Sequence, residues 1–179
     1  MKVDIFKTNK KYQIIYADPP WKYKDKGCNG NCESHYNTMN IEEISNLPIK
    51  NISNKDSILF LWVTYPMLQE GLKLMDSWGF KYKTIAFQWI KLNKSGIGYF
   101  FGLGRWTRGN SECCLIGTKG RIKRVSNKVG QLIVTPIEYH SKKPDIVREK
   151  IIELVGDLDR IELFARKESE GWDSWGDEI

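Results

Sequence analysis

The sequence has little that would place the protein in a membrane or in an oxidising compartment. No apolar run approaches the roughly 18 residues of a membrane-spanning helix, and the start "MKVDIFKTNKKYQ" has no apolar core followed by a cleavage site. The four cysteines, two of them adjacent, fit reduced packing thiols better than a disulfide framework. We therefore expect a cytoplasmic protein with free cysteines.

Clustered metal ligands are scarce as well. Cys28, Cys32 and His35 lie close together, but their spacing is not that of a standard zinc pair. A site with four ligands would need a further cysteine or His140 from a distant part of the chain. We expect incidental thiols in a mobile loop, and no bound metal.

The chain has no internal repeat and no linker long enough to divide it, so its 179 residues are expected to form one domain, 1–179. The formal charge is +6, and seven Trp, eight Tyr and seven Phe accompany the excess of Lys and Arg. Basic and aromatic residues together favour a nucleic-acid partner. Solubility alone is the other explanation of the charge.

Apolar runs separated by turn signals predict alternating strands and helices. Strands are expected at residues 12–17, 57–63, 80–92, 112–118, 131–137 and 160–165, and helices at residues 40–48, 66–78 and 144–155. This alternation is typical of an α/β fold with a mainly parallel sheet, in which ligands bind where strands end at their carboxyl edge. Asp18 and Arg166 each follow directly after a predicted strand.

The stretch "YADPPW", residues 16–21, combines one carboxylate with two prolines and a tryptophan. A proline after Asp18 favours extended geometry for that residue, and the proline rings supply no N–H donors. The available polar groups are therefore acceptors, namely the carboxylate of Asp18 and the carbonyl of Pro19. Two acceptors held close together match an amino group on an aromatic ring, and Trp21 offers a face on which that ring can stack.

An amino group on an aromatic ring is a poor nucleophile because its lone pair is delocalised. Accepting both of its hydrogens draws the nitrogen towards tetrahedral geometry and frees the lone pair for attack on an electrophilic methyl group. Asp18, Pro19, Pro20 and Trp21 therefore form a candidate catalytic motif. The alternative is that the prolines only end a strand and that Trp21 only packs.

Several ordered blocks extend this motif over nearly the whole chain: "YADPPW", "HYNTM", "LFLWVT", "GRWTRGNSECCLIGTKG", "HSKKPD", "IELFAR" and "GWDSWGDE". Together they resemble the DPPW family of adenine methyltransferases, the MT-A group that includes the eukaryotic messenger-RNA adenine methyltransferase and many bacterial and phage enzymes. The resemblance implies a Rossmann-like methyltransferase fold with the amine-binding motif first and the donor-binding strand last. It also implies S-adenosylmethionine as the methyl donor and adenine methylated on its exocyclic nitrogen as the product.

By the same resemblance, the donor lies against the last predicted strand and the C-terminal tail. The residues assigned to the donor in this way are Ala17, Asp18, Lys143, Phe164, Arg166, Gly176, Asp177 and Glu178. Lys143, Asp177 and Glu178 resemble positions that hold the methionine and adenosine parts of the donor, and Arg166 resembles a ribose contact. Many relatives have Asn where this chain has Asp177.

The segment "FFGLG", residues 100–104, imitates the donor-binding signature of other methyltransferases. No apolar strand is predicted immediately before it, so we interpret it as a glycine-rich target loop. The residues expected to contact the substrate are Tyr36, Trp106, Arg108, Glu112, Arg121, Lys123 and Arg124. Arg108 is expected either to form a salt bridge with Glu112 or to bind phosphate. Residues 119–128 hold five cations and no acid, which suits phosphate contacts but also a solvated face.

These patterns predict an enzyme that methylates adenine in nucleic acid, with DNA favoured over RNA by likeness to compact microbial members of the family. The target base has to be single-stranded or flipped out, because its amine cannot be reached inside the stack. A catalytically silent partner subunit is the alternative, but such relatives typically lack the acid or the prolines of the motif, which are intact here. Family habits also suggest a homodimer or a partner subunit.

Overall fold

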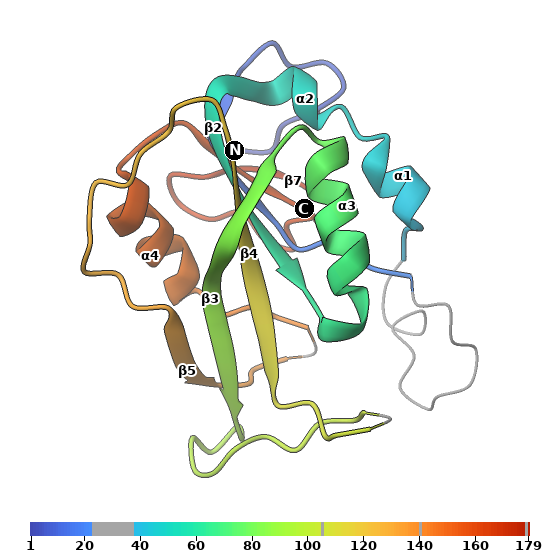
Figure 1. Ribbon diagram of the computed structural model, residues 1–179, viewed down its shortest axis with the longest axis vertical. Coiled ribbons are helices and arrows are strands. Elements are labelled where there is room, and N and C mark those ends of the chain that lie inside the picture. Colours follow the sequence, from blue (N-terminus) through green and yellow to red (C-terminus); the bar gives the residue numbers. More distant parts are fainter. Residues whose placement is uncertain (23–37, 105, 140, 178) are drawn as a thin grey trace.

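The computed structural model describes residues 1–22, 38–104, 106–139, 141–177 and 179 (Figure 1). Its strands are β1 (Tyr12–Ala17), β2 (Ser53–Val63), β3 (Lys81–Leu92), β4 (Ser111–Lys119), β5 (Leu132–Pro136), β6 (Arg160–Leu163) and β7 (Asp173–Trp175). Its helices are α1 (Ile41–Ser45), α2 (Ile49–Ile52), the 3₁₀ turn η2 (Tyr65–Met67), α3 (Leu68–Ser77) and α4 (Ile146–Val155).

The strands form one sheet in the order β5-β3-β4-β2-β1-β6-β7. In the described part of the chain, β1 pairs in parallel with β2 and β6, β3 with β5, and β6 with β7. Among these described strands, only β4 runs against its neighbours, which are β2 and β3. The predicted α/β fold with a mainly parallel, Rossmann-like sheet is therefore confirmed.

Helices cover both faces of the sheet, with α4 on one side and α1, α2 and α3 on the other (Figure 1). The alternation of side chains along β2 divides the core accordingly. Leu59, Leu61 and Val63 pack in the cluster that includes α1, α2 and α3, whereas Phe60 and Trp62 pack with α4. The apolar run predicted to be a central strand is thus buried on both faces, as expected of such a run.

Local signals in the sequence account for two helix boundaries. Asn40 accepts a hydrogen bond from the amide of Glu43, while the Glu43 carboxylate accepts one from the amide of Asn40, so the capping box that starts α1 is complete. Gly156, with φ of 92°, ends α4 in a conformation that disfavours other residues. None of the helices in the described ranges is long and apolar enough to cross a bilayer.

The strand β7 is absent from the strands that the sequence predicts. The sequence indicates a polar tail at its C-terminal end, yet Asp173–Trp175 pairs with Ile161–Leu163 at the edge of the sheet. Ser174 is also bonded to the N-terminus, since its amide donates to the carbonyl of Met1 over 2.9 Å. Pairing with both segments stabilises a strand whose three residues are too few and too polar to form a recognisable apolar run or alternation.

Candidate active site

A pocket of about 840 Å³ lies where β1, β2 and β6 end at their carboxyl edge. The reversed strand β4 starts at the same edge, so its first residues face the same space. The predicted site residues that line the pocket are Asp18, Pro19, Pro20, Trp21, Glu112, Lys143, Phe164, Arg166, Gly176 and Asp177. Segments assigned to different parts of the reaction therefore meet in one cavity.

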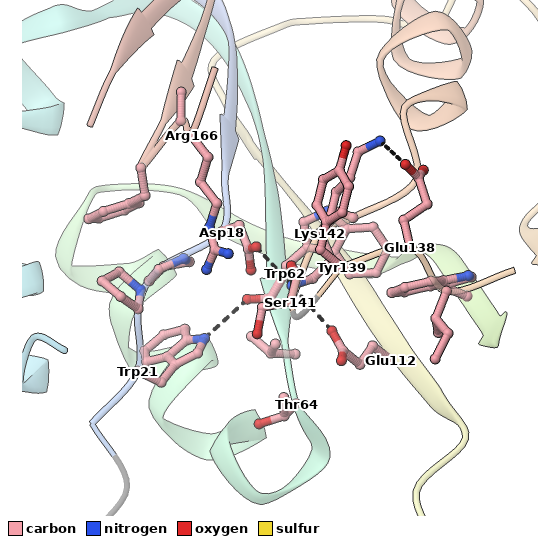
Figure 2. A pocket seen from close by; sticks show the side chains of 18 of the residues that line it. Asp18, Trp21, Trp62, Thr64, Glu112, Glu138, Tyr139, Ser141, Lys142 and Arg166 are labelled. Carbon is pink, nitrogen blue, oxygen red and sulfur yellow. Dashed lines mark hydrogen bonds and ion pairs between the residues drawn. The ribbon is translucent and has the colours of Figure 1, made fainter. Parts of the chain in front are cut away.

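A chain of alternating charges crosses this pocket (Figure 2). The Lys143 ammonium lies 2.8 Å from Oδ2 of Asp18 and 3.3 Å from Oε2 of Glu112. The other oxygen of Glu112 accepts a hydrogen bond from Lys91 on the neighbouring strand β3. All four side chains are largely buried, so solvent screens these interactions only weakly.

Burial and neighbouring charges set the protonation of this chain. Burial raises the pKa of Asp18 above its usual value, although Lys143 acts against this shift. Burial would also raise the pKa of Glu112, but Lys143 and Lys91 outweigh it and lower that pKa. For Lys143, the two carboxylates overcome the effect of burial and raise the pKa. Lys143 therefore stays charged, and Asp18 is the carboxylate closer to protonation.

The Asp-Pro-Pro-Trp turn is held by its own backbone and by residue 39. The carbonyl of Pro19 accepts the amide of Trp21 over 2.9 Å, and the carbonyl of Pro20 accepts the amide of Met39 over 2.9 Å. The indole of Trp21 donates to the carbonyl of Trp62 over 3.4 Å and is only 5% exposed. Trp21 therefore packs in the core and also lines the pocket, and the stacking of a base on its ring stays a prediction.

The opposite side of the pocket is built from the end of β6 and the tail. Phe164 has a φ of 61°, and with Ser141 at 59° it is one of two non-glycine residues with positive φ in the described structure. Both line the pocket, and such strained residues concentrate at functional sites. Gly176 permits close packing there, because a Cβ at this position would lie 2.3 Å from the carbonyl oxygen of Ala165.

Arg166 and Asp177 provide the charged groups of this side. Arg166 extends towards Asp18 (Figure 2), and its charge favours the ionised form of that carboxylate, partly offsetting the rise in pKa caused by burial. Asp177 is exposed at the rim. Ala17, in contrast, is fully buried at the end of β1 and positions Asp18 without lining the cavity.

Sequence reasoning missed several residues of the pocket wall. Trp62 lies at the end of β2 with the Lys143 ammonium 5.6 Å from its ring centre, and its indole donates to the Tyr16 hydroxyl over 2.7 Å. Trp89 and Lys91 come from the end of β3, and Tyr139 from the connection after β5. Their position in the sequence could have identified them, because aromatic residues near the carboxyl end of a predicted parallel strand lie at the edge of the sheet where ligands bind.

Other predicted substrate contacts lie away from the cavity lining. Trp106 is 99% exposed, and the Arg108 guanidinium lies 5.8 Å from the ring centre of Phe101. Of the two alternatives for Arg108, the salt bridge with Glu112 is not formed, because the Glu112 carboxylate pairs with Lys91 and Lys143 instead. Phosphate binding by Arg108 stays a prediction.

The basic run lies at the opposite edge of the sheet from the pocket. β4 starts near Glu112 and ends at Lys119, which pairs with Ser57 early in β2. The exposed side chains of Arg121, Lys123 and Arg124 follow from there, so their contact with phosphate stays a prediction. Tyr36, Glu178 and the segment with Cys28, Cys32 and His35 lie outside the described residues.

The mainly parallel sheet, with helices on both faces and a pocket at its strand ends, is the arrangement expected of a Rossmann-like methyltransferase fold. The MT-A70 family model matches residues 12–178, so the chain belongs to the MT-A70 family.

Three relatives illustrate the range of this family. The chain is 37% identical to the type II methyltransferase M.MunI of a Mycoplasma species, over 95% of this chain and 78% of that protein. It is 29% identical to an Arabidopsis thaliana N(6)-adenosine-methyltransferase MT-A70-like protein, over 99% of this chain and 25% of the relative. It is 30% identical to the human N(6)-adenosine-methyltransferase catalytic subunit METTL3, over 87% of this chain and 26% of the relative. The chain thus spans about a quarter of the plant and human proteins.

Proposed function

We propose that residues 1–179 form a methyltransferase domain that transfers a methyl group from S-adenosylmethionine to the exocyclic amine of adenine in DNA. One observation carries this proposal. The Asp18 carboxylate lines the same pocket as Phe164, Arg166 and Asp177, so an amine held by Asp18 and a donor held by the tail would meet.

The chemistry of the tail side fits the donor. Phe164 and Trp175 form an edge-to-face pair with ring centres 5.4 Å apart, which offers an apolar surface for an adenine ring. Asp177 supplies a carboxylate for ribose hydroxyls, with Glu178 as the second acid of the motif. Arg166 and Lys143 supply cations for the hydroxyl and carboxylate groups of the donor. When bound, the donor provides a methyl group activated by a positively charged sulfur.

Asp18 and Pro19 would hold the target amine. A carboxylate has about four lone-pair positions, so Asp18 can accept an amine N–H while Lys143 remains on Oδ2. The Pro19 carbonyl uses one lone pair for the Trp21 amide and keeps the second. Together they would orient the amine nitrogen towards the methyl carbon, and the carbon–sulfur bond would break as the new carbon–nitrogen bond forms. The raised pKa of Asp18 suits it to receive the proton that the nitrogen releases.

Lys143 would serve both substrates. Its ammonium keeps Asp18 ionised from 2.8 Å, and it stands between Asp18 and the loop at Ser141, where the carboxylate end of the donor would enter. Glu112 and Lys91 would hold it in place. In this interpretation Lys143 contacts the donor, as the resemblance implies, and also keeps its ion pair with Asp18.

DNA is favoured because M.MunI, a type II methyltransferase, matches over most of its length. RNA is the second candidate, since the plant and human relatives are named N(6)-adenosine methyltransferases. A silent partner subunit fits less well, because the acid and both prolines of the motif line the pocket. We further propose a cytoplasmic location, and a homodimer or partner subunit as the working assembly.

The test is incubation with labelled donor and duplex DNA, single-stranded DNA or RNA, followed by nucleoside analysis. Asp18→Asn should lower kcat by about 10²–10³, the cost of removing one preorganised group that binds the reacting atoms, while donor binding persists. Asp157→Asn is the matched control, since its carboxylate is 81% exposed and pairs with Arg160 at the opposite edge. Undiminished turnover by Asp18→Asn would remove Asp18 from the mechanism, and no methylated adenine on any polymer would refute the function.

A further inference from the structure

Five large apolar side chains are exposed beside the pocket. We call Ile97, Tyr99, Phe101, Leu103 and Trp106 the apolar rim. Their exposed fractions are 80%, 65%, 76%, 72% and 99%, so they bury little against the rest of the chain. Leu103 also lines the pocket, together with Phe100 and Lys94 from the same connection. The apolar rim is therefore continuous with the cavity.

The backbone holds these side chains outward. The amide of Phe100 donates to the carbonyl of Lys91 over 2.9 Å, and the amide of Gly102 to the carbonyl of Gly109 over 3.1 Å. A Cβ at Gly102 would lie 2.2 Å from the Gly109 carbonyl oxygen, and one at Gly104 would lie 2.0 Å from that of Thr107. The two arms of the connection thus pack backbone to backbone and extend beyond the ends of β3 and β4 (Figure 1).

Within the connection from β3 to β4 the charged residues have one sign. Residues 93–110 contain three cations and no Asp or Glu. Lys94 is exposed at the pocket, and the Arg108 guanidinium lies 5.8 Å from the Phe101 ring centre. Such a surface attracts a polyanion. A two-fold contact between copies would instead bring the same cations against each other, because both partners would present the same patch.

We propose that the apolar rim inserts into duplex DNA beside the target adenine and stacks on the bases that flank it, which helps to hold the adenine in the pocket. This inference rests on the proposed function. A base in a duplex has to leave the stack before its amine can be attacked. Proteins that open or kink a duplex insert apolar wedges between base steps, and aromatic side chains stack on exposed bases. The apolar rim supplies both kinds of side chain next to the cavity.

The experiment compares substrates that need opening with substrates that do not. Phe101→Ser/Trp106→Ser is assayed on a duplex that the wild-type protein methylates, on the same duplex with an abasic site opposite the adenine, and on the single strand. We expect kcat/KM on the intact duplex to fall at least about tenfold, as when one aromatic ring that stacks on a base is removed, and to fall clearly less on the other two substrates, whose adenine does not have to leave a base pair. Val125→Ser is the control, since its side chain is 71% exposed in the connection between β4 and β5.

A second measurement reports opening directly. A duplex with 2-aminopurine at the target position should brighten on binding Asp18→Asn protein, and the rise should be lost when the two rim substitutions are added. Equal losses on all three substrates would overturn the inference, as would an activity loss that follows dissociation of a dimer in sedimentation. A wild-type protein that methylates no polymer would refute the proposed function, whereas a wild-type protein that is active and a rim variant with equal losses on all substrates would refute only the role of the apolar rim.

Discussion

Replacing Lys143 by methionine should destabilise the protein in a manner that depends on pH. The substitution keeps the apolar stem and removes an ammonium shared by Asp18 and Glu112 at 2.8 and 3.3 Å. At an effective dielectric constant of about 20, each attraction is worth about 5–6 kcal/mol, most of which desolvation offsets. Removing one partner of a buried pair costs about 3–5 kcal/mol, and we expect a loss of that size at neutral pH.

The sign of the pH dependence follows from the carboxylates. In the wild-type protein the depressed pKa of Glu112 contributes stability that is present above its unfolded-state pKa and is lost as pH falls through the folded-state value. Without Lys143 the pKa values of both acids rise, so the variant loses stability as pH increases. The difference in the free energy of unfolding between variant and wild type should therefore be largest at neutral pH and should become smaller in mild acid.

Urea unfolding followed by tryptophan fluorescence at several pH values measures both the loss of stability at neutral pH and its change with pH. The control is Lys142→Met, whose side chain is 15% exposed against 11% for Lys143. Lys142 pairs with carboxylates that are about half exposed, so its loss should cost about 0–1 kcal/mol. Equal costs for the two variants, or a gap that does not narrow in acid, would refute the idea that Lys143 is an internal counter-ion.

Two further predictions concern activity and binding. Burial raises the pKa of Asp18 above 3.8, and only the ionised form accepts the amine, so kcat/KM should decrease on acidification at pH values above 3.8. A pH–rate profile that stays flat down to pH 3.8 would contradict this role. Replacing Arg121, Lys123 and Arg124 by serine should flatten the dependence of log K on log salt by about 0.9 for each phosphate that these side chains neutralise, and an unchanged slope in fluorescence-anisotropy titrations would show that this edge does not touch nucleic acid.

Strong local signals made much of the fold predictable. The uninterrupted apolar run in β2 and the reciprocal cap of Asn40 and Glu43 are properties of adjacent residues, and both were interpreted correctly. β7 was missed because its strand conformation comes from pairing with β6, a contact that no property of Asp173–Trp175 signals.

The candidate site divides in the same way. The acidic turn after β1 was visible because its residues are contiguous. The partners of Glu112 could not be found in this way, because they depend on the pairing of β3 with β4. Trp89 lies opposite Glu112 in the sheet, and Lys91 therefore lies diagonally across from Glu112. Arg108, four residues away in sequence, lies in the connection before β4 and points elsewhere. Strand register decides such pairs, and proximity in sequence gives no guide to it.

The reversed direction of β4 separates one part of the pocket edge from the rest. The acidic turn follows β1 and the tail follows β6, and both strands belong to the parallel part of the sheet. The connection from β3 to β4 lies at the same edge but is attached to the antiparallel pair. That connection can be lengthened, shortened or exchanged while the acidic turn and the tail keep their framework. Changes in this one connection would alter the surface that lies beside the pocket and leave the acidic turn and the tail in place.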